Sequence, residues 1–180
     1  MALPQTHFPG PRAAHALAGA LVAVLLLVAG PVLADCTDFP APGVDWKRCR
    51  MDRRDLTEVD LSGAHLRDTS FMRANLSGSV LSGADAFRAK FISTVLVGAI
   101  LDGARLAEAD MTKADLTGAS LKGANLQRAK LFRAILRGAD LTGAEMRGAD
   151  FLNADLSGAL WVDGSQVCAE GSVGRCKAAK

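Results

Sequence analysis

The chain reads Ala109-Asp110-Met111-Thr112-Lys113, Ala114-Asp115-Leu116-Thr117-Gly118, Ala119-Ser120-Leu121-Lys122-Gly123, Ala124-Asn125-Leu126-Gln127-Arg128 in the middle of a tract that repeats every five residues. A small residue, usually alanine, stands first in each five, and a large apolar residue stands third. The pattern holds from Arg54 to Asp163, which is 110 residues or 22 successive fives. This periodic tract is the feature from which the fold is predicted.

A period of five matches neither of the common regular structures. The apolar face of an α-helix recurs about every 3.6 residues, and the faces of a strand alternate every 2. If the first and third residues of each five point inward, each five is a short extended piece followed by a corner. One such piece buries too little apolar surface to offset the entropy of ordering it, so coils must stack on coils. The pattern therefore predicts an all-β solenoid.

The number of sides follows from sorting the third-position residues into columns twenty residues apart. One column, called here the Phe71 column, collects aromatic residues at Phe71, Phe91 and Phe151. Two more columns are leucine throughout, from Leu56 to Leu156 and from Leu61 to Leu141, and the fourth runs from Leu66 to Met146. Four distinct columns predict a quadrilateral coil with four pentapeptides per turn.

Glycine at the fifth position sorts by the same period. It follows the columns of Leu56 and Leu61 almost throughout, whereas polar and charged residues follow the other two, apart from Gly148. Because glycine readily adopts positive φ, we expect two of the four corners to require φ > 0, as a type II turn does, and the other two not to.

The repeat resembles the pentapeptide-repeat family, whose motif Ala-(Asp/Asn)-Leu-X-X is met at Ala114-Asp115-Leu116, Ala124-Asn125-Leu126 and Ala154-Asp155-Leu156. The resemblance covers the whole tract and implies a right-handed quadrilateral parallel β-helix. Some cytosolic members resemble DNA in shape and acidity and bind type II topoisomerases. That role needs a strongly negative face, whereas the chain after Ala34 carries 20 Lys and Arg against 19 Asp and Glu. A DNA mimic is therefore the weaker alternative, and no nucleic-acid partner is expected.

Two segments flank the repeats at the N-terminus. Residues 1–34 have a weakly basic start and an apolar run from Ala16 to Ala29, and they end in Val32-Leu33-Ala34, which is typical of a secretory signal peptide. An uncleaved anchor is the alternative, although the run is shorter than the roughly 20 residues that span a bilayer. Residues 35–53 are expected to form an N-terminal cap, and residues 164–180 a C-terminal cap or tail. We expect a periplasmic or secreted protein that does not contact the membrane after cleavage.

The four cysteines lie in the two caps, at Cys36, Cys49, Cys168 and Cys176. Five to six coils at about 4.8 Å each separate the caps by roughly 25 Å, which is beyond disulfide reach. We therefore expect Cys36 to pair with Cys49 and Cys168 with Cys176, with free thiols as the alternative. The same distance excludes one zinc ion bound by all four.

Candidate catalytic residues are scarce. His65 is the one histidine after the leader, and the chain has no tyrosine. Asp and Asn recur at the second position of the fives, and we expect them to bond nearby backbone at the corners rather than to hold metal. The sequence predicts a protein that is not an enzyme and needs no cofactor.

One outward feature of the Phe71 column is distinctive. Its fourth positions form an apolar stripe, and its fifth positions form a basic one beside it. With Phe87 on the adjoining side, the candidate interface comprises Met72, Arg73, Phe87, Ile92, Lys113, Phe132, Arg133 and Leu152. Exposed apolar rows mark interfaces, and the neighbouring cations favour an acidic partner. Alternatively, the fourth-position side chains only half-bury against the next coil.

From these features we expect an exported, non-enzymatic solenoid that acts as a protein-binding or scaffold module. The alternative is a structural protein that self-assembles, as a homodimer, through the same stripe or through its C-terminal end.

Overall fold

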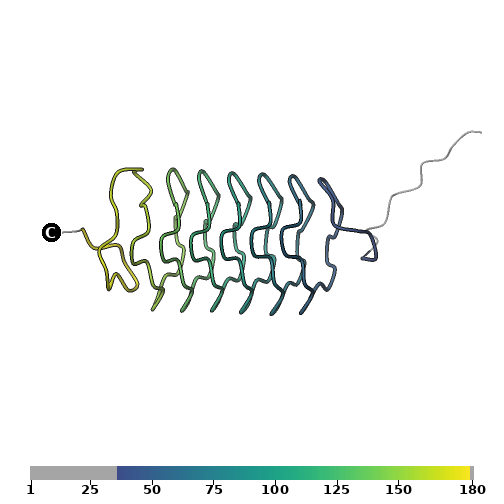
Figure 1. Ribbon diagram of the computed structural model, residues 1–180, viewed down its shortest axis with the longest axis horizontal. Coiled ribbons are helices and arrows are strands. Elements are labelled where there is room, and N and C mark those ends of the chain that lie inside the picture. Colours follow the sequence, from purple (N-terminus) through teal and green to yellow (C-terminus); the bar gives the residue numbers. More distant parts are fainter. Residues whose placement is uncertain (1–35, 179–180) are drawn as a thin grey trace, which may run out of the picture. The chain divides into compact units, whose positions relative to one another are not determined.

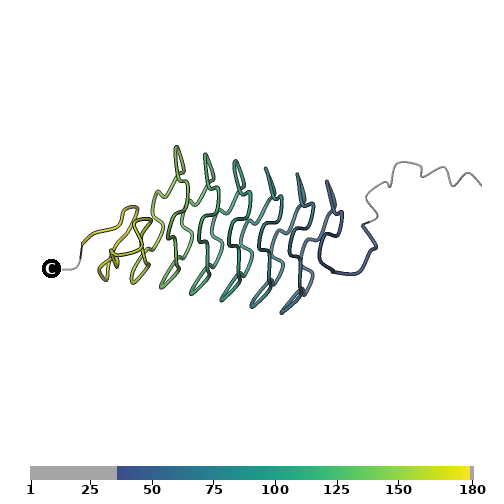
Figure 2. The ribbon, with the colours of Figure 1, turned by 90° about the horizontal axis from the view of Figure 1, so that it is seen from above.

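The computed structural model describes residues 36–178, and the predicted signal segment lies outside this range. Figure 1 shows these residues as coils stacked along one axis, from the blue N-terminal end to the yellow C-terminal end, and Figure 2 shows the stack from above. Parallel bridges join residues twenty apart, from Asp45↔His65 to Asp140↔Leu160. The four-sided coil is confirmed, and the fold is a right-handed quadrilateral parallel β-helix.

Each side of a coil contributes one bridging residue, the second of its five, rather than a longer strand. Leu116 illustrates how the coils are joined, since its N–H donates to the carbonyl of Ile135 in the next coil at 2.7 Å. The preceding residue, Asp115, donates to the carbonyl of Thr94 in the previous coil at 3.0 Å. Every coil is thus bonded in both directions, which satisfies the backbone without long strands.

The first and third residues of the fives fill the interior. Phe71 and Phe91 are fully buried and stack with their ring centroids 5.2 Å apart. Trp46 and Met51 are also fully buried, and Trp46 lies 6.5 Å from Phe71. Trp46 and Met51, both in the predicted N-terminal cap, therefore close the N-terminal end of the core.

Three first-position residues are hydroxyl-bearing instead of alanine, namely Thr69, Ser79 and Thr94, and all three are fully buried. Each hydroxyl donates to the carbonyl 23 residues earlier, as Thr94 does to Phe71 at 2.7 Å. The buried oxygen is therefore satisfied, and the substitution fits the core without an unpaired polar atom.

The expectation that only two corners need positive φ is wrong. Lys113 has φ +58° and Glu108 has φ +59°, close to the +65° of Gly118. The other corners are closed in the same way, because the first residue of the next five donates to the preceding core carbonyl, as Ala114 does to Met111 at 3.0 Å. The exception is Val59, whose N–H donates to the Ser79 hydroxyl at 3.3 Å. Side chains at the fifth position therefore accept a conformation that costs about 1–2 kcal/mol. Glycine is concentrated on two sides, with Gly148 as an exception on a third, and nothing in the structure explains this preference.

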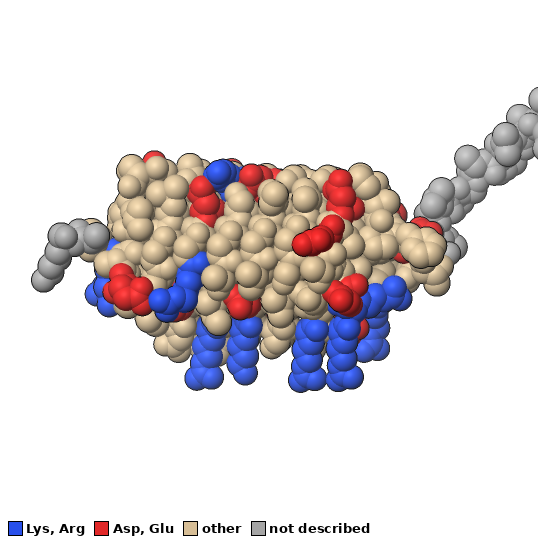
Figure 3. Space-filling model, in the orientation of Figure 1, with Lys and Arg blue, Asp and Glu red and all other residues tan. Residues whose placement is uncertain are grey.

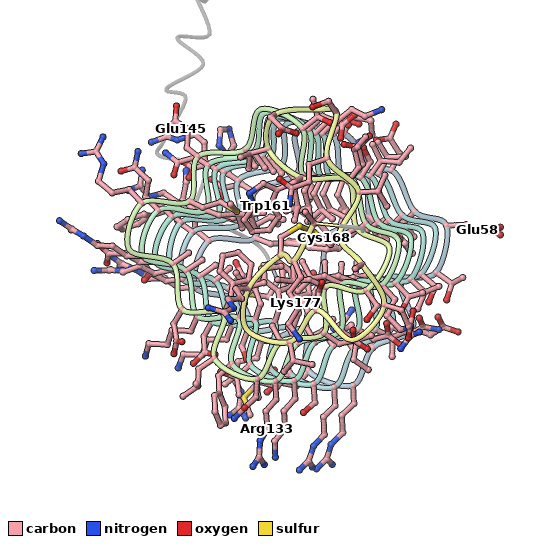
Figure 4. All side chains as sticks on the ribbon, turned by 90° about the vertical axis from the view of Figure 1, so that its left-hand side faces the viewer. Glu58, Arg133, Glu145, Trp161, Cys168 and Lys177 are labelled. Carbon is pink, nitrogen blue, oxygen red and sulfur yellow. A yellow bond between two sulfur atoms is a disulfide. The ribbon has the colours of Figure 1, made fainter. Side chains whose placement is uncertain are left out.

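The chain after Trp161 folds back across the end of the solenoid with antiparallel pairing. Leu160 bridges Val167, and Asp155 bridges Val173. Figure 4 shows this segment lying over the end of the last coil, with Cys168 near its centre. The structure contains two local disulfides, Cys36–Cys49 with a Cα–Cα distance of 5.4 Å and Cys168–Cys176 with 4.9 Å. Neither links the two caps.

Candidate protein-binding surface

The fourth and fifth residues that follow the Phe71 column lie at one corner of the solenoid. Because successive coils stack at about 4.8 Å, residues twenty apart form rows along the axis. The structure thus brings together seven of the eight predicted interface residues: Met72, Arg73, Ile92, Lys113, Phe132, Arg133 and Leu152. We call this set, with Arg53 described below, the Met72 corner.

The apolar row of this corner is only partly open to solvent. Met72, Ile92 and Phe132 are half-buried, whereas Leu152 is 60% exposed. The guanidinium of Arg133 lies 5.1 Å from the centroid of the Phe132 ring. The row therefore supports neighbouring coils as well as facing solvent, and it is most accessible toward the C-terminal end.

The basic row is exposed, and it is one residue longer than the sequence analysis predicts. Arg73, Lys113 and Arg133 are joined by Arg53, which sequence reasoning assigned to the N-terminal cap. The five-residue register could have placed Arg53 in this row, because Met51 stands in the Phe71 column and Arg53 is two residues after it. Figure 3 shows Lys and Arg side chains projecting as a comb from the lower edge, the edge where Figure 4 labels Arg133. We call these four residues the cation row.

The cation row makes no ion pair within residues 36–178. The preceding corner is different, because its fifth positions alternate in sign. There Arg88 meets Asp68 at 2.8 Å, and Arg128 meets Glu108 at 3.5 Å. Arg88 and Arg128 are thus paired within the chain at that corner, whereas the cation row at the next corner has no counterion in residues 36–178.

A hollow of about 400 Å³ lies at the N-terminal end of the cation row. It is lined by Arg50, Asp52, Arg53, Met72 and Arg73. Partial burial raises the pKa of Asp52, but hydrogen bonds from Ser70 and Met72 and the nearby Arg50 together lower it below its usual value. Asp52 is therefore ionised at neutral pH, and the hollow holds three guanidinium groups against one carboxylate.

Phe87, the eighth predicted residue, lies at the preceding corner and is half-buried. The guanidinium of Arg67 lies 4.9 Å from its ring centroid, and that of Arg88 lies 5.1 Å away. Both cations also contact carboxylates, Asp85 and Asp68 respectively. The Phe87 ring is therefore packed against cations of the same chain, and it does not lie with the other seven predicted interface residues.

A second apolar set lies on the two sides that carry glycine. Val95 and Val97 are each 38% exposed, and Ile100 is 39% exposed. These fractions exceed those of Met72, Ile92 and Phe132, but no cationic row runs beside this set. This apolar set is smaller than the Met72 corner and has no adjacent row of cations.

The second-position carboxylates bond the corners locally, as the sequence predicts. Asp155 accepts hydrogen bonds from the Ser157 N–H at 3.0 Å and hydroxyl at 2.6 Å, and it contacts Arg137 at 2.9 Å. Partial burial raises the pKa of Asp155, but these hydrogen bonds and the Arg137 cation together lower it below its usual value.

The candidate catalytic and metal-binding residues are dispersed over the described part of the chain. His65 is exposed at a second position. No group of three or more His, Cys, Asp or Glu residues within 36–178 is arranged to hold a metal ion. No helix in that range has the length and apolar character needed to cross a membrane.

Comparisons with known proteins agree with the fold. The family model described as pentapeptide repeats (8 copies) matches residues 55–91, 87–123 and 124–160. A search of curated proteins finds no match. Among solved structures, HetL from the cyanobacterium Nostoc sp. strain PCC 7120, a pentapeptide repeat protein involved in heterocyst differentiation regulation, is 33% identical, with 67% of each chain covered and a TM-score of 0.48.

Two further solved structures are similar. Trypsin-treated QnrB1, a plasmid-mediated fluoroquinolone resistance protein, is 20% identical over 65% of this chain and 67% of its own, with a TM-score of 0.48. A pentapeptide repeat protein from the Arabidopsis thaliana thylakoid lumen is 28% identical over 70% and 86%, with a TM-score of 0.29. Because the family model spans more than half of the chain, the protein belongs to the pentapeptide-repeat family.

Proposed function

We propose that the protein is an exported, non-enzymatic binding or scaffold module that docks a protein partner through the Met72 corner. The observation that carries this proposal is the cation row, which has no counterion in residues 36–178 and runs beside a partly exposed apolar row. Apolar contact and unpaired charge on one straight edge are the features of a docking surface.

The rigidity of the solenoid supports this role. Each coil is hydrogen-bonded to the coil on either side, so the corner is ordered before any partner arrives. A surface that is already ordered loses little conformational entropy on binding. The corner can therefore bind with a narrow contact area.

Export is supported by the two disulfides and by the signal-like segment at residues 1–34. No cysteine within residues 36–178 is free. Disulfides form and persist in oxidising compartments. We place the mature protein in the periplasm or outside the cell.

Self-assembly is the second candidate, and the C-terminal end favours it. The returning chain covers two sides of the last coil, because Leu156 donates to Ser172 and Trp161 donates to Gln166, both at 2.8 Å. Even so, three core-column residues at this end, Met146, Phe151 and Trp161, are only half-buried. An incompletely covered apolar end is a place for a second copy to stack.

In-cell photocrosslinking tests both candidates. A photoreactive residue is placed at Leu152 and Phe132, with Thr117 as the matched control because it is a fourth-position residue at another corner. An adduct of different mass from the Met72 corner, and none from Thr117, supports a separate protein partner. An adduct of twice the mass supports a homodimer through this corner. Absence of any adduct from Leu152 and Phe132 contradicts docking there.

A further inference from the structure

We infer that the partner at the Met72 corner is an acidic protein whose docking face presents a row of carboxylates along the solenoid axis. The inference rests on the proposed protein-binding function and adds the chemistry of the partner.

The charge of the chain is concentrated on this side. The outward positions of the Phe71 column hold seven cations, which are the cation row with Arg50, Lys90 and Lys130, against the carboxylates of Asp52, Asp110 and Asp150. Seven against three leaves a net charge of +4 on one side, whereas the whole chain carries +2, so the remainder carries −2. This side is therefore positively charged, whereas the rest of the chain carries a net negative charge.

The three carboxylates form no ion pair with the cation row. Asp110 accepts the N–H of Thr112 at 3.1 Å, and Asp150 accepts the N–H of Leu152 at 2.9 Å. Asp52 contacts Arg50 at 3.4 Å, outside the row. Within the row, Arg53 and Arg73 stand one coil apart at about 4.8 Å, and like charges at that spacing repel. Lys113 and Arg133 are spaced in the same way, so carboxylates from outside relieve repulsion as well as add attraction.

The geometry of the row defines what fits it. The row extends over five successive coils, which is four spacings or about 19 Å, and Ser93 leaves one gap in the middle. Carboxylates on neighbouring strands of a sheet repeat at this interval, and the turns of a helix repeat at about 5.4 Å. The hollow among Arg50, Arg53 and Arg73 takes one acidic side chain, because guanidinium groups bind carboxylates in a bidentate manner.

Two other anionic occupants fit less well. Single-stranded nucleic acid needs aromatic faces for base stacking. The aromatic side chain of this corner is Phe132, and Arg133 lies over its ring. A lipid surface needs several apolar side chains that enter the headgroup region, whereas Leu152 is the one member of the apolar row that is largely exposed.

The first test uses a fluorescein-labelled poly-L-glutamate oligomer that is long enough to span the row, with poly-L-lysine as the opposite-charge probe. We expect the protein to bind poly-L-glutamate alone, and the affinity to fall steeply between 0.1 M and 1 M salt, where the Debye length shrinks from about 10 Å to about 3 Å. Absence of binding at 0.1 M salt overturns the inference. Binding to vesicles of phosphatidylcholine and phosphatidylglycerol without binding to poly-L-glutamate also overturns it.

Matched variants locate the binding. Replacement of the cation row by glutamine (Arg53→Gln, Arg73→Gln, Lys113→Gln, Arg133→Gln) is expected to weaken binding at least about tenfold, the combined factor of four exposed pairs. The control removes four cations that contact carboxylates within the chain (Arg88→Gln, Arg105→Gln, Arg128→Gln, Arg137→Gln) and is expected to change binding by less than about twofold. Equal effects of the two sets overturn the inference.

A charge-preserving variant separates charge from folding. Arg53→Lys, Arg73→Lys and Arg133→Lys together are expected to retain most of the binding, and thermal unfolding curves verify that all variants remain folded. Loss of binding in this folded lysine variant would show that the charge of the row does not hold poly-L-glutamate, and it overturns the inference.

The photocrosslink from Leu152 then separates this inference from the proposed function. Loss of the adduct in the glutamine variant, with retention in the control variant, supports an acidic partner. If the adduct persists undiminished in the glutamine variant, the acidic-partner inference is overturned and the docking function stands. If the unmodified protein gives no adduct from either Leu152 or Phe132, the docking function and the inference both fail.

Discussion

Replacement of Leu116 by alanine is the most direct test of the coil register. The Leu116 side chain is fully buried in its column between Leu96 and Leu136, which are also fully buried. Loss of three carbon atoms removes about 2.4 kcal/mol of transfer free energy at about 0.8 kcal/mol per methylene. The cavity cannot collapse readily, because hydrogen bonds of 2.7 Å from Leu116 to Ile135 and from Leu96 to Asp115 hold the coils at a fixed spacing. We therefore expect the free energy of unfolding to fall by about 3–5 kcal/mol.

Urea denaturation followed by circular dichroism measures this change, and two variants calibrate it. Leu56→Ala should cost less, about 2–3 kcal/mol, because Leu76 is its one column neighbour and the side chain is 4% exposed. Thr117→Ala should cost about 1 kcal/mol, which is the worth of its 2.6 Å hydrogen bond to Asp115 at the surface. The register is refuted if Leu116→Ala costs no more than Thr117→Ala.

Three further predictions concern the corners, the carboxylates and the caps. Gly118→Ala should lower the free energy of unfolding by about 0.5–1 kcal/mol, and Lys113→Gly should raise it by a similar amount, because both positions have positive φ. The cost of placing a side chain at positive φ exceeds the unfolded-state entropy that glycine adds, and the two effects partly cancel. A destabilised Lys113→Gly in the same denaturation assay would show that the two corners differ. The lowered pKa of Asp155 means that its ionised form stabilises the fold above the unfolded-state value of about 3.9, and this contribution disappears as pH falls through the folded-state pKa. The melting temperature should therefore fall less below about pH 4 in Asp155→Asn than in the unmodified protein, and equal pH profiles would contradict this. Replacement of both Cys168 and Cys176 by serine should cost about 2.5 kcal/mol, because the bridge closes a loop with a sequence separation of 8, and an unchanged urea midpoint would show that the C-terminal cap is held by packing alone.

The sequence predicts the architecture because the solenoid is built from local rules repeated at a fixed period. A column sorted every twenty residues predicts that Asp115 lies above Val95, and the structure has that bridge. The period also places Met51 in the Phe71 column, where it is buried. Each coil contacts mainly its neighbours, so the place of a residue in the five-residue register predicts which residues it stacks against in the adjacent coils.

Other features could not be predicted because the period does not encode them. Glycine at Gly118 and lysine at Lys113 suggested two kinds of corner, yet one backbone turn serves both. The outward position of Ile92 left open whether its side chain faces solvent or half-buries against the next coil, and the structure shows it half-buried. The antiparallel return of the chain near Val167 lies beyond the last five, where no repeat remains to be read.

The uniform corner backbone explains why the surface, rather than the fold, carries information about the partner. Glu108, Lys113 and Gly118 adopt nearly the same φ, so the solenoid does not dictate the charge at the fifth position. Alternating signs are available to the chain, as the Asp68–Arg88 pair demonstrates one corner away at the same spacing. A cation row on an identical backbone is therefore not a requirement of folding. It raises electrostatic repulsion that an alternating row would avoid, and an external row of carboxylates is the chemistry that removes this cost.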